Sequence, residues 1–174
     1  MQHSIHWPAG YIPGFTDNFC SNEVIIANAE VEQVWQYLND TKYWPHYYSN
    51  VSDIRFYQDY QGTELYPQAR FFFKTFGFPV EAEITEYIPA QNGEPARIAW
   101  HGWSGEQGAE DRLDVHHAWL IEQLDGGRVR ILTQETQNGN PAKELAKTVP
   151  NPMINGHQEW LDGIVNSVKT GLSL

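Results

Sequence analysis

The amino-acid sequence predicts an α+β fold in which a curved antiparallel sheet of about six to seven strands wraps a long C-terminal helix. Three observations carry this prediction. Residues 151–172 place apolar side chains at helical spacing along one stripe, roughly 100° wide. Most of the chain before this stripe alternates between apolar and polar side chains, as half-buried strands do. The triplet Asp125-Gly126-Gly127 separates two alternating segments and is typical of a hairpin turn.

The first expected elements are a strand and two short helices. Residues 19–27 end in the β-branched run Val24-Ile25-Ile26 and predict the strand. Asn28 is expected to cap the first helix, because apolar residues follow it at positions i, i+3, i+4 and i+7. These apolar residues are Val31, Val34, Trp35 and Leu38. A second short helical turn is expected over residues 42–48.

Alternation predicts the remaining strands, and turn residues separate them. The expected strands cover residues 51–57, 69–76, 80–85, 96–104, 114–124 and 128–135, with a turn at Gln91-Asn92-Gly93. Residues 137–150 predict a connection with one helical turn at 142–147. The final helix is expected to start at the cap Asn151, with Pro152 in its first position. Its apolar stripe consists of Ile154, His157, Leu161, Ile164, Val165, Val168 and Leu172.

The domain organisation is expected to be simple. Residues 1–18 mix Pro, Gly and aromatic side chains and predict an irregular N-terminal arm packed on the body. The arm either lies over a pocket mouth or merely packs on the surface. Residues 19–174 contain no repeat, linker or low-complexity tract, and they predict a single domain.

Composition and charge exclude several classes of partner. The chain has 11 Lys and Arg against 22 Asp and Glu, a net charge of −11, which argues against nucleic acid and anionic membranes. No signal peptide and no apolar stretch of about 18 residues is recognised. We therefore expect a cytoplasmic protein without membrane insertion, either a monomer or a homodimer. Aromatic residues make up 14% of the chain, as in a large core or an aromatic-lined pocket.

Several sequence motifs resemble one superfamily. The run from Asn22 to Trp35, then Leu38-Asn39-Asp40 and Tyr43-Trp44-Pro45, is similar to the opening of START-like helix-grip (SRPBCC) domains. The hairpin at Gly126–Val129 and the segment Gly156–Leu161 also look like that pattern. The resemblance covers residues 20–172 and points to the polyketide cyclase/dehydrase-like branch. It implies a helix-grip fold with a hydrophobic cavity between sheet and long helix. Such domains include lipid and hormone carriers, cyclases, hydrolases and lyases.

Two residues are candidates for acid–base chemistry, His117 and Glu135. Adjacent strand residues point to opposite faces, so the apolar neighbours of His117 place it toward the cavity and His116 toward solvent. His101 is expected to face outward. Glu135 has the parity of the apolar residues before it, so it should end on the inner face and could act as a base beside His117.

Each candidate also has a purely structural interpretation. His117 could be a hydrogen-bonded histidine in a wet cavity. Glu135 could sit at the rim, either solvated or paired with Arg112 or Arg130.

The sequence predicts no metal and no cofactor. His101, His116, His117 and His157 lack a diagnostic ligand spacing, and adjacent histidines on a strand diverge. No GxSxG, P-loop, GxGxxG or HExxH motif occurs. The single cysteine, Cys20, is expected to be buried and inert.

Aromatic and histidine side chains are expected to line the cavity. The predicted ligand-binding residues are Tyr47, Tyr48, Phe71, Phe73, Trp100, Trp119 and His157. The leading hypothesis is a protein that binds a small apolar, aromatic or polycyclic molecule. The alternative is a cyclase or dehydratase in which His117, with Glu135 or a tyrosine hydroxyl, moves a proton. A third possibility is a stress or chaperone-cofactor role of the outer surface.

Two glycines of the final helix, Gly156 and Gly163, lie opposite the apolar stripe and lower helix propensity there by about 1 kcal/mol each relative to alanine. Close approach by the N-terminal arm or by a second subunit would explain them.

Overall fold

The computed structural model describes residues 2–91 and 93–174, so Met1 and Asn92, the centre of the expected 91–93 turn, lie outside the described residues. The elements of the described chain are β1 (Asn18–Ala27), α1 (Val31–Asn39), a 3-10 turn (Thr41–Tyr43), α2 (Trp44–Tyr47), β2 (Val51–Phe56), β3 (Arg70–Thr75), β4 (Phe78–Ile88), β5 (Ala96–Ser104), β6 (Leu113–Leu124), β7 (Arg128–Asn138), α3 (Asn140–Lys147) and α4 (Pro152–Thr170). The order and type of the predicted elements are confirmed.

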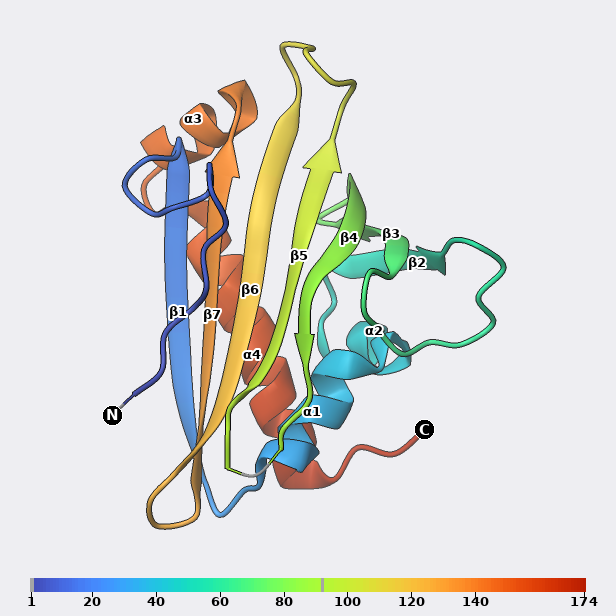
Figure 1. Ribbon diagram of the computed structural model, residues 1–174, viewed down its shortest axis with the longest axis vertical. Coiled ribbons are helices and arrows are strands. Elements are labelled where there is room, and N and C mark those ends of the chain that lie inside the picture. Colours follow the sequence, from blue (N-terminus) through green and yellow to red (C-terminus); the bar gives the residue numbers. More distant parts are fainter. Residues whose placement is uncertain (1, 92) are drawn as a thin grey trace.

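One antiparallel sheet forms the first layer of the molecule. Within the described residues it has seven strands in the order β1-β7-β6-β5-β4-β3-β2. Figure 1 shows α4 crossing behind this sheet, with α1 beside its lower half and α3 at the upper ends of β1 and β7. The inner face of the sheet and the helices share one core, which includes Trp44, Phe71, Ile98, Trp100, Leu161 and Ile164. The helix-grip architecture is thus confirmed.

The ends of α4 follow from the sequence. The Oδ1 atom of Asn151 accepts a hydrogen bond from the backbone N–H of Met153 at 3.1 Å, and Pro152 occupies the first turn. Gly171 ends the helix in the left-handed conformation, with φ +66°. None of the described helices is both long and apolar enough to cross a membrane.

The start of α1 differs from the prediction. Asn28 is not the cap, because it lies two residues before the N-cap and adopts a left-handed φ of +55°. Glu30 is the N-cap, and its backbone N–H donates to Oε1 of Gln33 at 2.9 Å. Asparagine tolerates positive φ, so Asn28 serves the turn after β1 instead.

The covered face of α4 is rotated relative to the predicted stripe. Ile154 is 42% exposed, whereas Gly156, Trp160 and Ser167 are buried. The reason is that α2 and the β3–β4 turn pack against the face of α4 that carries Gly156 and Gly163. A Cβ atom on Gly163 would lie 2.3 Å from the carbonyl oxygen of Tyr47, and one on Gly156 would lie 2.9 Å from the ring of Phe76. The proposal that the arm or a second subunit approaches these glycines is therefore wrong.

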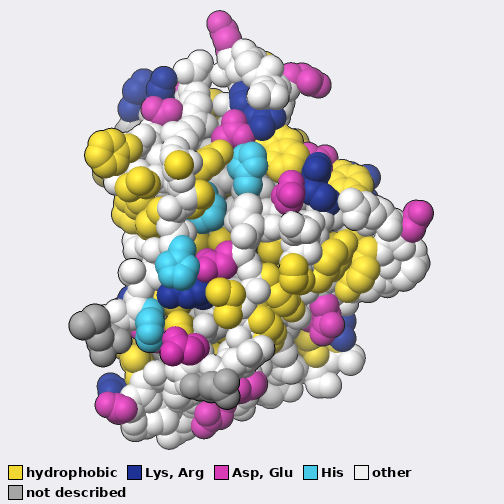
Figure 2. Space-filling model, viewed as in Figure 1, with side chains coloured by type: hydrophobic (Ala, Val, Ile, Leu, Met, Phe, Trp, Pro, Cys, Tyr) yellow, Lys and Arg dark blue, Asp and Glu magenta, His cyan; other side chains and the backbone are white. Residues whose placement is uncertain are grey.

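The N-terminal arm lies on the outer face of the sheet, away from α4 (Figure 1). Ile5 is buried there among Ala99, Ala118, Leu120 and Leu132. Backbone carbonyls anchor it: Ser4 O accepts from Arg97 at 2.8 Å, and His3 O accepts from Arg130 at 3.1 Å. Figure 2 shows histidine side chains with acidic ones beside them along this face. The histidine–carboxylate contacts are His3–Glu122, His6–Glu86 and His101–Asp114.

Replacing Ile5 with aspartate is expected to release the arm, because a carboxylate cannot be buried without a partner among four apolar side chains. Chymotrypsin should then cleave the aromatic arm faster than in the unmodified protein, as followed by mass spectrometry over time. The same change at Ile12, which is half exposed, is the matched control. Equal cleavage rates for the two variants would contradict this placement of the arm.

Candidate functional site

A cavity of about 650 Å³ lies between the inner face of the sheet, α3 and the first half of α4. Such a volume falls within the range of about 300–1,000 Å³ typical of small-molecule sites. Aromatic and aliphatic side chains form its walls, and four polar side chains gather at one end. The aromatic wall residues are Tyr48, Phe73, Phe76, Phe78, Trp100, Trp103 and Trp160. The polar end consists of His117, Glu135, Gln137 and His157.

Strand register places the polar residues side by side. Glu135 on β7 pairs with Cys20 on β1 and with His117 on β6, and His117 in turn pairs with Trp100 on β5. Directly paired residues of antiparallel strands point to the same face. The side chains therefore form a row across the inner face of the sheet, in the order Cys20, Glu135, His117 and Trp100. His157 on α4 faces this row and contacts Glu135.

Glu135 is the centre of this group. Its Oε2 atom lies 3.2 Å from Nδ1 of His117 and 3.2 Å from Nε2 of His157. Its Oε1 atom accepts a hydrogen bond from Nε2 of Gln137 at 2.6 Å. The two imidazole rings are stacked, with centroids 4.4 Å apart and 13° between their planes. All three acid–base side chains are buried and line the cavity.

The remaining nitrogen of each imidazole has its own partner. Nε2 of His117 lies 2.8 Å from Oγ1 of Thr133, which donates to the carbonyl of Ala118 at 3.3 Å. Nδ1 of His157 lies 3.4 Å from Sγ of Cys20, whose thiol faces the carbonyl of Glu135 at 3.9 Å. Each ring therefore has a contact on the side that faces away from Glu135. Cys20 is buried but does not line the cavity.

A chain of amide side chains connects Glu135 to the start of α4. Gln137 Oε1 accepts from Nδ2 of Asn18 at 2.7 Å, and Asn18 Oδ1 accepts from Nδ2 of Asn151 at 2.7 Å. Because Asn151 also caps α4, the helix that carries His157 and the strand that carries Glu135 are fixed to each other by polar contacts.

The two histidines are in different electrostatic environments. Burial, with the neighbouring His157 and His116, holds the pKa of His117 well below its usual value. Burial also opposes a charge on His157, but Cys20 and Glu135 outweigh it and raise the pKa of His157 to about 10. One carboxyl group therefore lies between a histidine whose pKa is raised and a histidine whose pKa is lowered.

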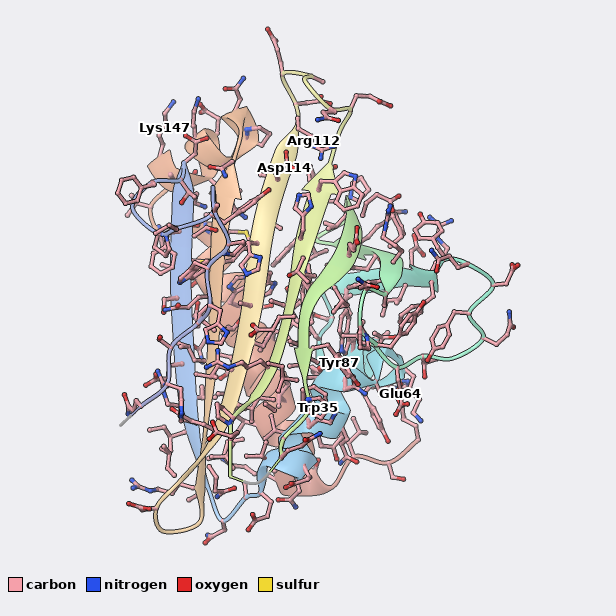
Figure 3. The ribbon with its side chains drawn as sticks, viewed as in Figure 1. Trp35, Glu64, Tyr87, Arg112, Asp114 and Lys147 are labelled. Atoms are coloured by element: carbon pink, nitrogen blue, oxygen red, sulfur yellow. The ribbon has the colours of Figure 1, made fainter. Side chains whose placement is uncertain are left out.

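The structure brings both predicted acid–base residues, His117 and Glu135, into the cavity. It does not place Glu135 at the rim beside an arginine. Arg112 binds Asp114 through Nη2 at 2.8 Å at the upper end of β6 (Figure 3), and Arg130 binds Glu122 through Nη1 at 2.7 Å. Both arginines therefore serve other carboxylates.

Two neighbouring histidines lie on the other face of the sheet. His101 points outward as expected and contacts Asp114 at 2.9 Å. His116 also points outward, but it is not exposed to solvent as predicted, because Trp7 and Tyr11 of the arm cover it. Burial lowers the pKa of His116 to about 4. An irregular arm carries no periodic signal, so its position could not be predicted.

The predicted ligand-binding set divides into two groups. Tyr48, Phe73, Trp100 and His157 line the cavity. Phe71 and Trp119 are instead fully buried in the core, and Tyr47 lines a separate, smaller pocket beside α2. The prediction did not include Trp160 or Gln137. Trp160 lies at the edge of the predicted helical stripe. Gln137 lies beyond the predicted end of the last strand at Glu135, although it shares the parity of Glu135.

Comparisons with known proteins agree with this geometry. Residues 27–141 match the family model described as polyketide cyclase / dehydrase and lipid transport. The crystal structure of hypothetical protein jhp0584 from Helicobacter pylori is 49% identical, covers 97% of this chain and 98% of its own, and has a TM-score of 0.91. No curated protein matches the chain.

More distant structures share the fold. A START superfamily protein from Mycobacterium smegmatis is 16% identical, with a TM-score of 0.55 over 86% of this chain and 98% of its own. The di-domain ARO/CYC protein BexL from the BE-7585A biosynthetic pathway is 11% identical, with a TM-score of 0.59 over 87% of this chain and 46% of its own. The family model matches residues 27–141, more than half of the chain, so the chain belongs to the polyketide cyclase / dehydrase and lipid transport family.

Proposed function

We propose that the protein binds one small hydrophobic molecule, aromatic or polycyclic in character, in the cavity between the sheet and α4. The observation that carries this proposal is the cavity of about 650 Å³, which aromatic side chains enclose on several sides. Aromatic walls favour flat ligands, because rings stack face to face or edge to face on them. The family description, which includes lipid transport, supports the same function.

The polar end defines how such a ligand would be oriented. His117, Glu135 and His157 lie together with Gln137 in a cavity whose remaining lining is mostly apolar. A ligand with one hydroxyl or carbonyl group would direct that group toward them and its rings toward Trp100 and Trp160. The exposed rings of Phe76 and Phe78 lie in the cavity lining and provide an apolar entrance.

A fluorescent probe tests the binding function. N-phenyl-1-naphthylamine is neutral, has three aromatic rings and emits strongly in apolar surroundings. We expect saturable binding of one probe molecule per chain, detected by its emission. Val115→Phe, which adds a ring to a side chain lining the cavity, should weaken this binding at least about tenfold by filling the space.

The matched control is Ile25→Phe, on the half-exposed outer side of β1. This variant should bind the probe as the unmodified protein does. Equal affinity for Val115→Phe and Ile25→Phe, or no saturable binding by the unmodified protein, would refute a ligand site in the cavity.

Proton transfer on the bound molecule is the second candidate function. It is favoured by one observation, the contact of His117 with Glu135 at 3.2 Å inside the cavity. The test uses 2-tetralone, an aromatic ketone with exchangeable protons next to its carbonyl. We expect catalysed deuterium exchange, which His117→Gln should lower by roughly 10²–10⁴-fold while probe affinity stays within a few fold. Exchange at the uncatalysed rate in the unmodified protein would eliminate this candidate.

A further inference from the structure

We propose that His117, Glu135 and His157 bind one divalent transition-metal ion at the polar end of the cavity. The ligand atoms of these three residues all lie within 4.8 Å of one another. Nδ1 of His117 and Nε2 of His157 are each 3.2 Å from the same oxygen, Oε2 of Glu135. Ligands bound side by side on one ion are separated by about this distance, since metal–ligand bonds measure about 2.0–2.2 Å.

Each of the three ligands has a second partner on its far side. Thr133 holds Nε2 of His117 at 2.8 Å, Cys20 faces Nδ1 of His157 at 3.4 Å, and Gln137 donates to Oε1 of Glu135 at 2.6 Å. Outer partners of this kind fix the tautomer and the orientation of metal-bound histidines. An ordinary buried hydrogen-bond network does not need every member oriented toward one point.

The outer partners leave three electron pairs facing each other. The Thr133 hydroxyl donates to the Ala118 carbonyl, so it accepts the Nε2 proton of His117. The Cys20 thiol faces the Glu135 carbonyl, so its sulfur accepts the Nδ1 proton of His157. With each outer nitrogen protonated, the inner nitrogens and Oε2 of Glu135 can all bind one cation together. A metal ion in this position displaces the proton between His157 and Glu135.

The ligand set selects the class of metal. Two imidazoles and one carboxylate suit Zn²⁺, Fe²⁺ or Co²⁺, whereas Mg²⁺ and Ca²⁺ prefer oxygen ligands alone. The two rings are nearly parallel, so an ion lying in both ring planes requires one ring to turn about its Cβ–Cγ bond. All three residues line the cavity, so the remaining coordination positions face its interior and any molecule bound there.

Cobalt titration of the purified full chain tests the site. We expect one Co²⁺ per chain, with visible ligand-field absorption of a nitrogen and oxygen site and no thiolate charge-transfer band, because Cys20 is an outer partner. Glu135→Gln keeps the shape of the side chain and removes its charge, and it should weaken binding more than about 100-fold. Thr133→Val should weaken it by about 10–100-fold.

His101→Gln is the matched control, because His101 contacts a carboxylate at a similar distance on the outer face of the sheet. It should leave cobalt binding unchanged. If Glu135→Gln fails to fold, nitrogen NMR of the unmodified protein with added Zn²⁺ is the alternative test. The chemical shifts of Nδ1 of His117 and Nε2 of His157 should change, and those of the His101 nitrogens should not. Absence of stoichiometric Co²⁺ binding, or unchanged binding by folded Glu135→Gln, would overturn the proposal. Probe binding in the cavity does not depend on this result.

Discussion

Replacing Trp160 with alanine is expected to lower the free energy of unfolding by about 3–5 kcal/mol. Trp160 is buried on α4 and joins the helix to the sheet and to α2. Its ring stacks on Tyr48 with centroids 4.7 Å apart and meets Trp44 at 5.0 Å and Trp119 at 5.2 Å. Its indole N–H donates to the Tyr47 hydroxyl at 3.2 Å. The substitution would remove all of these contacts and enlarge the cavity.

Denaturant unfolding, followed by circular dichroism, measures this loss. Trp35→Ala is the matched control, because Trp35 is only half-buried and packs edge-on against Tyr87, with ring centroids 5.4 Å apart (Figure 3). We expect the Trp160 variant to lose clearly more stability than the Trp35 variant. Equal losses would show that α4 is not held to the sheet as described.

Replacing Gly163 with alanine is expected to cost about 1–3 kcal/mol, although alanine favours helices by about 1 kcal/mol. The new Cβ atom would lie 2.3 Å from the carbonyl oxygen of Tyr47 and 2.7 Å from its ring. A backbone atom cannot move aside as a side chain can, so α2 and α4 would have to separate. The midpoint of thermal unfolding measures the effect.

Gly156→Ala is the control on the same helix. Its Cβ atom would lie 2.9 Å from the ring of Phe76 and 3.7 Å from the hydroxyl of Tyr48, which is an ordinary contact. Phe76 is 57% exposed, so its ring can swing away. We therefore expect little change in stability for this variant. A similar loss for both glycine variants would contradict the close contact of α2 with α4.

The fold could be predicted because its signals are local. Alternation along the strands, the turn at Asp125-Gly126-Gly127 and the cap at Asn151 each depend on residues close in sequence. The α4 stripe was misplaced because burial there depends on α2 and the β3–β4 turn, which arrive from elsewhere in the chain. Periodicity alone does not say which side of a helix a neighbour will approach.

The site was partly predictable for the same reason. Strand parity placed His117 and Glu135 on the inner face, and register then made them direct neighbours. The contact of Cys20 with His157 joins residues 137 positions apart, and the contact of His157 with Glu135 joins a helix to a strand across the intervening α3. No local pattern encodes those contacts. Phe71 and Trp119 were assigned to the cavity because the sequence does not distinguish an aromatic wall from an aromatic core.

The central claim is that side chains leave the space between the sheet and α4 unfilled and open to one small molecule. Native mass spectrometry of the full chain, purified from its own host and then exposed to N-phenyl-1-naphthylamine, tests this claim directly. We expect one bound small molecule per chain, either carried from the host or replaced by the probe, and its loss in Val115→Phe. A chain that retains only its own mass in both preparations would contradict the account.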